Sequence, residues 1–139
     1  MLLSCQPLEI LAMSTFQQSK FTEKSGQVAL FAFFQIMKAW HVKNEEQRTI
    51  LGNPPESMFY QLKNGEASVL SYNMLERISC ILGIYKALTT LFPTREQANA
   101  WLLKPNLAFK HKSALEVMLK GRRTHLREVR RYLDAQHVE

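Results

Sequence analysis

The chain has 139 residues, of which 46% are hydrophobic and 22% charged, and only five are Gly and five Pro. This composition excludes a disordered chain and a turn-rich β fold, and it favours helices in one core or in two small units that share one. The two cysteines, Cys5 and Cys80, lie too far apart to indicate a disulfide framework, so we expect a reduced, cytoplasmic protein. The net charge is +6, and residues 104–139 hold nine Lys or Arg against four Asp or Glu, so the basic character lies in the last quarter.

The first 24 residues predict a weak helix or a loose tail. Their apolar run lacks a basic start and is interrupted at Gln6, Pro7 and Glu9, so a secretory signal is not indicated. No window approaches the roughly 18 consecutive apolar residues of a membrane-spanning helix. From Gly26 to Trp40 a very apolar helix is predicted, and its wide apolar arc indicates a central core helix.

Two short helices are predicted next, on either side of a turn that contains glycine and proline. Asn44 is the expected cap of the first helix, with Gln47 in capping-box position, and Gly52 ends it. The second runs from about Pro55 to Lys63. Its predicted inner face consists of Met58, Phe59 and Leu62.

A long helix and three further helices complete the predicted fold. Ser71 opens the long helix and Pro93 stops it, with an inward stripe of Leu75, Ile78, Leu82, Tyr85 and Phe92. Capping boxes at Thr94 with Gln97 and at Ser113 with Glu116 open the next two, and Thr124 starts the last. The predicted fold class is all-α, with a tail over residues 1–24, a bundle over 25–92 and a small helical domain over 93–139, joined near Pro93 or within the long helix.

Two short helices around a tight turn, flanked by longer apolar helices, are typical of a helix-turn-helix that reads DNA. The residues that its second helix would expose to DNA are Ser57, Tyr60, Gln61, Lys63 and Asn64. Ser57 and Gln61 suit base edges, whereas the others suit phosphates. The alternative is a pair of core helices joined by a proline turn. Because Glu56 and Glu66 outnumber Lys63 on this face, a monomer would bind DNA weakly, and we expect a homodimer.

The sequence gives no indication of catalysis. Its four histidines are scattered without metal-ligand spacing, and no glycine-rich phosphate loop or nucleophile motif occurs. We therefore expect no enzyme, no metal and no cofactor.

An ordered series of fragments runs from about Phe34 to the C-terminus. It comprises Glu46-Gln47, Leu51-Gly52, Lys63-Asn64-Gly65, Leu75-Glu76-Arg77-Ile78-Ser79, Leu88 to Phe92, Ala100-Trp101-Leu102, Pro105-Asn106, Phe109, Ser113 to Gly121, and Val129 to Ala135. In this order and at these intervals the fragments resemble the Xre/MbcA/ParS antitoxins that accompany RES-domain toxins. One departure is Lys110-His111-Lys112, which stands where a glycine-containing turn is common in that family.

The resemblance implies an antitoxin of a type II toxin-antitoxin system. It implies a dimer that binds its own promoter and represses its operon, and a toxin-binding domain over residues 93–139. The implied partner is a RES-domain toxin that degrades NAD and is inactive while its nucleotide pocket is covered.

The toxin-binding residues that we expect from this resemblance combine a turn, a basic face and the chain end. They are Trp101, Pro105, Asn106, Lys112, Arg123, Arg127, Arg130, Arg131 and Glu139. The four arginines are expected to point largely outward and to steer the chain onto an acidic rim. Simpler alternatives stay open: Trp101 in the core, Pro105-Asn106 as a turn only, the arginines as a solvated face, and a frayed chain end.

Two other functions are compatible with the sequence. One is a stand-alone helix-turn-helix regulator whose C-terminal part serves dimerisation. The other is an interaction module whose helix-turn-helix has lost DNA binding.

Overall fold

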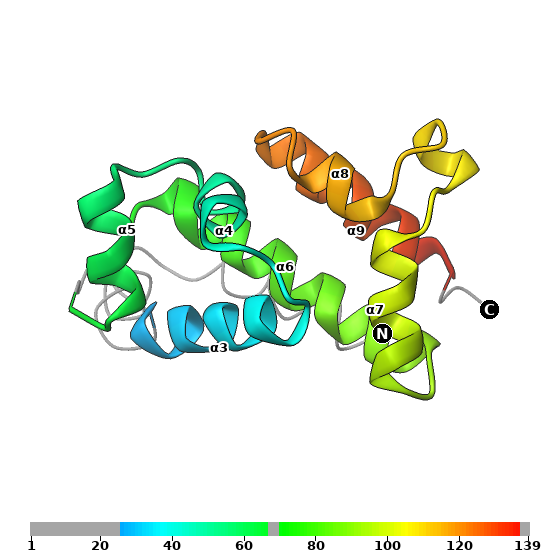
Figure 1. Cartoon of the computed structure of the whole chain (residues 1–139), viewed down its shortest axis with the longest axis horizontal. Coiled ribbons are helices and arrows are strands. Elements are labelled where there is room, and N and C mark those ends of the chain that lie inside the picture. Colours follow the sequence, from blue (N-terminus) through cyan, green and yellow to red (C-terminus); the bar gives the residue numbers. More distant parts are fainter. Residues whose placement is uncertain (1–25, 67–69, 137–139) are drawn as a thin grey trace, which may run out of the picture.

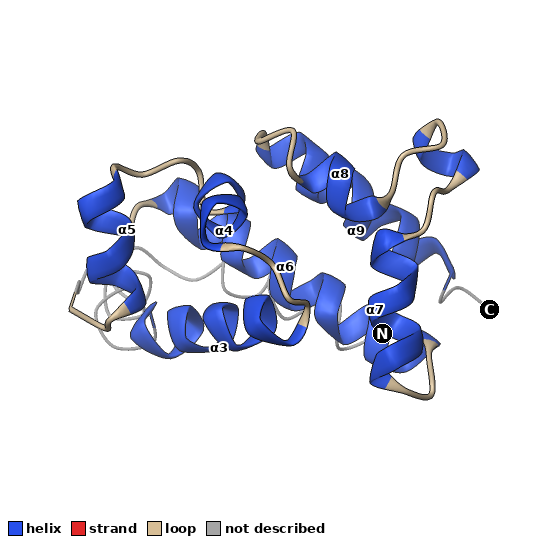
Figure 2. Cartoon of the chain, in the orientation of Figure 1, coloured by secondary structure: helices blue, strands red, loops and turns tan. Residues whose placement is uncertain are grey.

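The computed structural model describes residues 26–66 and 70–136, and every regular element in them is helical (Figures 1 and 2). The elements are α3 (Gly26–Ala39), α4 (Asn44–Ile50), α5 (Glu56–Lys63), α6 (Tyr72–Leu91), α7 (Arg95–Leu103), the 3-10 helix η2 (Leu107–Phe109), α8 (Ala114–Met118) and α9 (Arg123–Gln136). The predicted all-α class is confirmed. The predicted N-terminal tail lies outside the described residues.

Helix α6 is the axis of the molecule. Helices α3, α4 and α5 gather around its N-terminal half, and α7 follows from its C-terminal end (Figure 1). The side chain of Asn99 in α7 donates to the carbonyl of Ala39 at a distance of 3.0 Å, which ties α7 to the end of α3. Residues 60 positions apart in sequence are thereby held together.

Helix α9 packs along α6, and this is the most extensive helix-helix packing in the described residues. Arg123 pairs with Glu76 and Arg130 lies against Gly83, so both contacts join residues 47 positions apart. Because the sequence separation is the same at both contacts, the two helices advance in the same direction, and α9 runs parallel to α6. Leu126, Val129 and Leu133 form the buried face of α9, as predicted.

The burial of α6 differs from the predicted stripe. Leu75 and Ile78 are buried as expected, but Leu82, Tyr85 and Phe92 are only partly buried. The buried apolar residues of α6 are instead Met74, Leu75, Ile78, Ile81, Ile84, Ala87 and Leu88. Since α3 and α9 both pack on this helix, its apolar surface is wider than a single-stripe pattern predicts.

The helix caps are partly as predicted. The capping box of Ser113 and Glu116 is confirmed, and the hydroxyls of Ser71 and Thr94 accept from backbone N–H groups three residues on. The prediction that Asn44 caps α4 is wrong, because the cap is Lys43 and the helix starts one residue earlier.

That shift of one residue changes the role of Gln47. Glu46 takes the capping-box position, and its carboxylate accepts from the backbone N–H of Lys43. Gln47 is buried, and its side chain donates to the carbonyl of Val42 at 2.8 Å. No helix in the described residues is long and apolar enough to cross a membrane.

Candidate functional site

One face of α5 is open to solvent. The exposed residues of this helix include Ser57, Tyr60, Gln61 and Lys63, and Asn64, which caps the C-terminal end of α5, is exposed as well. On the opposite face Phe59 and Leu62 are each 1% exposed, and the Phe59 ring packs edge-on against Phe34. The five residues predicted to contact DNA therefore share one short helix and its end, and their exposure is as predicted. Their contact with DNA stays a prediction.

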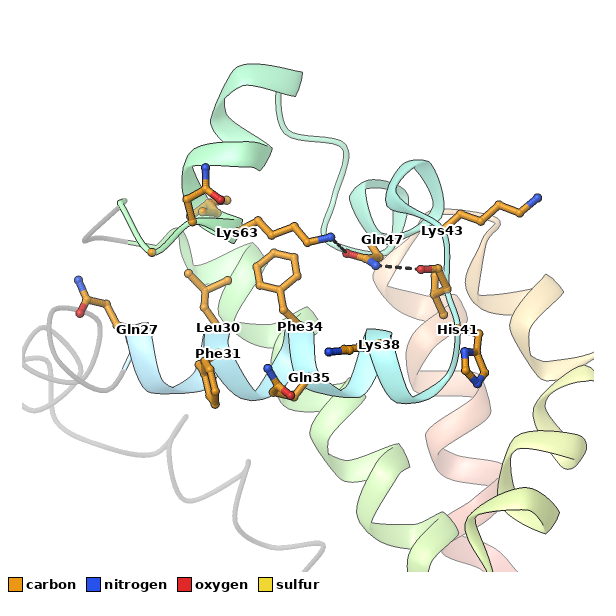
Figure 3. A pocket seen from close by; sticks show the side chains of 14 residues that line it. Gln27, Leu30, Phe31, Phe34, Gln35, Lys38, His41, Lys43, Gln47 and Lys63 are labelled. Carbon is orange, nitrogen blue, oxygen red and sulfur yellow. Dashed lines mark hydrogen bonds between the residues drawn. The ribbon is translucent and has the colours of Figure 1, made fainter.

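Lys63 differs from the other residues of this face, because its side chain contacts α4. Its ammonium group donates to the side chain of Asn44 at 2.5 Å and to that of Gln47 at 3.2 Å, and it lies 5.7 Å from the centre of the Phe34 ring. Figure 3 shows this side chain reaching from the end of α5 to the start of α4. It crosses an open pocket of about 670 Å³ that is lined by residues of α3, α4 and α5. Lys63 thus holds the two short helices together.

The turn between α4 and α5 depends on a left-handed backbone. Gly52 has a φ of 109° and Asn53 a φ of 59°, and a Cβ atom at Gly52 would lie 3.1 Å from Nε of Arg77. Arg48 donates to the carbonyl of Pro54, and Arg77 to that of Ile50. The side chains of two arginines therefore fix the angle at which α5 leaves α4.

The arginines of α9 are less exposed than predicted. Only Arg131 is exposed, Arg123 is partly buried beside Glu76, and the Arg130 side chain is 13% exposed with its Nε 3.6 Å from the carboxylate of Asp134. Nη1 of Arg127 is buried and has no hydrogen-bond partner among the described residues. The expectation that all four point largely outward is wrong for Arg127 and Arg130, because the parallel packing of α9 turns them toward α6.

These arginines lie near a partly buried thiol and a buried guanidinium on α6. Burial raises the pKa of Cys80, while the nearby Arg130 and Arg127 oppose the shift. Burial, followed by repulsion from Arg123, lowers the pKa of Arg77. The contact between α6 and α9 therefore contains charged side chains as well as apolar ones.

Three aromatic rings join α7, η2 and α9. Trp101 stacks on Tyr132 with ring centres 6.0 Å apart, and Phe109 meets both rings edge-on. Phe109 is 4% exposed, and Trp101 is partly buried. Trp101 thus contributes to the packing of its own chain, whatever else it contacts.

The loop after α7 is short and internally bonded. Asn106 caps η2 by accepting from the N–H of Ala108, and its backbone N–H donates to the carbonyl of Lys112. Pro105 and Lys112 are exposed, and Asn106 is partly buried. Residues Lys110 and His111 both have positive φ angles, of 56° and 70°.

Two further points concern the predicted chain end and metal binding. Glu139 lies outside the described residues. Within those residues no group of three or more His, Cys, Asp or Glu side chains is placed to hold a metal ion.

The model of one protein family matches residues 87–137 of the chain. That family is the C-terminal toxin-binding domain of the Xre/MbcA/ParS antitoxins. The chain belongs to the Xre/MbcA/ParS antitoxin family. The antitoxin is also similar to the uncharacterized protein y4oB of Sinorhizobium fredii (strain NBRC 101917 / NGR234), with 42% identity over 107 residues that cover 77% of this chain and 82% of the relative. No solved structure matches the chain.

The family match covers most of the residues that were predicted to bind a toxin. All those expected to contact a toxin lie within it, apart from Glu139. The match begins at residue 87, inside α6, so the boundary placed between residues 92 and 93 stays a prediction.

Two exposed residues in this domain were missed from the sequence. Leu103 is 61% exposed and Leu107 is 76% exposed. Leucines close in sequence to Trp101 and Phe109 are expected in the core. The exposure of Leu103 and Leu107 becomes evident only from the structure of the turn between α7 and η2. No pattern in the sequence distinguishes them from their buried neighbours Leu102 and Phe109.

Proposed function

We propose that this antitoxin binds a RES-type, NAD-degrading toxin, covers its nucleotide pocket, and represses its own operon through a helix-turn-helix made of α4 and α5. The observation that carries the proposal is the match of residues 87–137 to the toxin-binding domain of the family. Inhibition would come from occlusion and requires no chemistry by this chain. The protein would act in the cytoplasm, where its toxin and its operator are.

The DNA-binding half of the proposal is supported by the geometry of α5. Ser57, Tyr60 and Gln61 are exposed on a helix that is held at a defined angle by the Gly52 turn and by Lys63. Hydrogen bonds from such side chains to base edges discriminate between bases by about 1–3 kcal/mol per good pair.

Charge supports a dimer as the DNA-binding form. Residues 26–66 contain four Lys or Arg and four Asp or Glu, so the part that would face DNA has no net positive charge. The ammonium of Lys63 is also engaged with Asn44 and Gln47. Neutralisation of phosphates dominates non-specific affinity, so two copies of α5, one DNA turn apart, would be needed for tight binding.

The DNA half is tested by changing Tyr60 and Gln61 to alanine together. We expect binding to the DNA upstream of the gene, measured by fluorescence anisotropy at fixed salt, to weaken by about 30-fold or more, given about 1 kcal/mol for each lost contact. Gln136→Ala, at an exposed glutamine of α9, is the matched control and should bind as the wild type does.

The same variant separates the two activities. Tyr60→Ala/Gln61→Ala should still co-purify with a co-expressed RES-domain toxin and still protect cells from it. Release of the toxin by this variant would contradict the division into two sites. A wild-type chain that binds upstream DNA and no RES-domain protein would favour the stand-alone regulator.

A further inference from the structure

The toxin-binding domain exposes two large apolar side chains among its described residues. These are Leu103, at the last position of α7, and Leu107, at the first position of η2. An isolated exposed leucine is ordinary on a protein surface. Here the two flank one turn, and four residues of chain span at most about 14 Å, so a single partner surface can cover both.

The turn that carries them is rigid. The N–H of Asn106 donates to Lys112 and its carbonyl accepts from His111, closing the loop on itself. Phe109 packs edge-on against both Trp101 and Tyr132 and anchors the loop to α7 and α9. Leu107 is therefore held out to solvent on a fixed base, and little conformational freedom is left to lose when a partner binds.

The backbone of this loop is strained. Lys110 and His111 both adopt left-handed conformations, which cost side-chain-bearing residues about 1–3 kcal/mol each and persist only where surrounding contacts hold them. Strain of this kind is concentrated at binding and catalytic sites. The hydrogen bonds of Asn106 and the packing of Phe109 hold the loop in this shape.

The segment that carries the two leucines has charged residues of one sign. Residues 103–112 include Lys104, Lys110 and Lys112 and no Asp or Glu, and all three lysines are exposed. A partner that fits this surface has an apolar depression bordered by carboxylates.

We propose that Leu103 and Leu107 are the apolar anchors through which this antitoxin seats on its toxin, with the three lysines set around them. The inference rests on the proposed function and names the contact surface within it. Exposed apolar side chains on a basic segment match the anatomy of protein interfaces, where a few buried anchors carry most of the affinity.

The test uses the full chain and a RES-domain protein, sought among the products of the adjacent genes, with affinity measured by titration calorimetry. Leu103→Asp/Leu107→Asp should weaken binding by about 100-fold or more, because each anchor contributes at least about tenfold when buried. Leu103→Met/Leu107→Met keeps the apolar surface and should bind within about threefold of the wild type. Both leucines are mostly exposed, so the thermal midpoint of the free chain should change little.

Val28→Asp/Phe31→Asp provides the matched control. These side chains are 69% and 67% exposed on α3, outside the toxin-binding match, and this variant should bind the toxin as the wild type does. Equal losses in the two aspartate pairs would overturn the proposal. So would a Leu103→Asp/Leu107→Asp chain that binds the toxin normally but has lost self-association, because the surface would then serve a second copy.

The proposed function and this inference fail in different ways. If the wild-type chain does not bind the RES-domain protein, the proposed function fails. If it binds and Leu103→Asp/Leu107→Asp binds within about threefold of it, the inference alone is overturned.

Discussion

At the scale of single residues, Lys63 has a structural role that its sequence position does not reveal. Its ammonium bonds to Asn44 and Gln47 of α4, and the Gln47 side chain is itself held by the carbonyl of Val42. Because Gln47 is 5% exposed, its amide oxygen depends on Lys63 for the partner that the structure gives it. A buried polar group that loses its partner destabilises the fold.

Lys63→Met should therefore lower the free energy of unfolding by about 1 kcal/mol, because it leaves the buried oxygen of Gln47 without this donor. Urea titration followed by circular dichroism measures the change. Lys120→Met, at an exposed lysine after α8, is the control and should unfold as the wild type does. If both variants are equally stable, the bonds of Lys63 to α4 are not stabilising, and its side chain is free for phosphate contact.

At the scale of elements, the packing of the Arg130 guanidinium of α9 against α6 depends on a missing side chain. A Cβ atom at Gly83 would lie 2.5 Å from Cζ of Arg130, well inside contact distance. The Arg130 guanidinium is mostly buried and lies near Asp134, so moving it disturbs the α6–α9 contact. Glycine within a helix costs about 1 kcal/mol relative to alanine, and here that cost is offset by the packing it permits.

Gly83→Ala should lower the free energy of unfolding by about 1–2 kcal/mol, since overpacking outweighs the gain in helix propensity. In an Arg130→Ala background the same change should instead stabilise by up to about 1 kcal/mol, because the clash is gone and only the propensity remains. Chemical denaturation of the four proteins in this cycle measures both signs. A stabilising effect in both backgrounds would mean that Arg130 moves aside without cost.

At the scale of the whole molecule, the two halves share α6. Helix α3 packs on it, and α9 lies along it and contributes the fully buried Leu126 and Val129. Removing α9 would leave the apolar residues of α6 that it covers in contact with water. Burial of such side chains is worth about 1.5–3 kcal/mol each, which is a large part of the stability of a small domain.

A chain that ends at Lys112 should consequently lose its cooperative thermal transition, although α3 to α7 are all present. Differential scanning calorimetry and binding of a hydrophobic dye would detect the loss. A chain that ends at Gln136 keeps the whole of α9 and should melt as the full-length protein does. A sharp transition in the shorter chain would mean that the bundle before Pro93 folds independently.

Much of the fold follows from local sequence signals. Ser71, Thr94 and the Ser113 box start helices where predicted, and the last helix buries the predicted Leu126, Val129 and Leu133. The cap of α4 was misplaced by one residue, because Asn44 and Lys43 both precede a plausible box and sequence spacing alone does not choose between them. Capping and periodicity act over three or four residues, so they are readable without the fold.

The candidate site was predictable where it depends on one helix. The exposed face of α5 follows from the burial of Phe59 and Leu62, and periodicity specifies the rest of that face. The orientation of Arg127 and Arg130 depends on where α9 lies against α6, which periodicity does not contain. The exposure of Leu103 and Leu107 likewise depends on a loop whose shape is held by Asn106 and Phe109.

The sequence by itself determined the helical class, most of the helix starts and the family, because these depend on local patterns and on ordered fragments along the chain. Only the tertiary structure decided that α9 runs parallel to α6, that Lys63 connects α5 to α4, and that two leucines stand exposed on a closed loop. Each of these is a contact between residues far apart in sequence or a consequence of one. Such contacts form when the whole chain packs, and no local pattern encodes them.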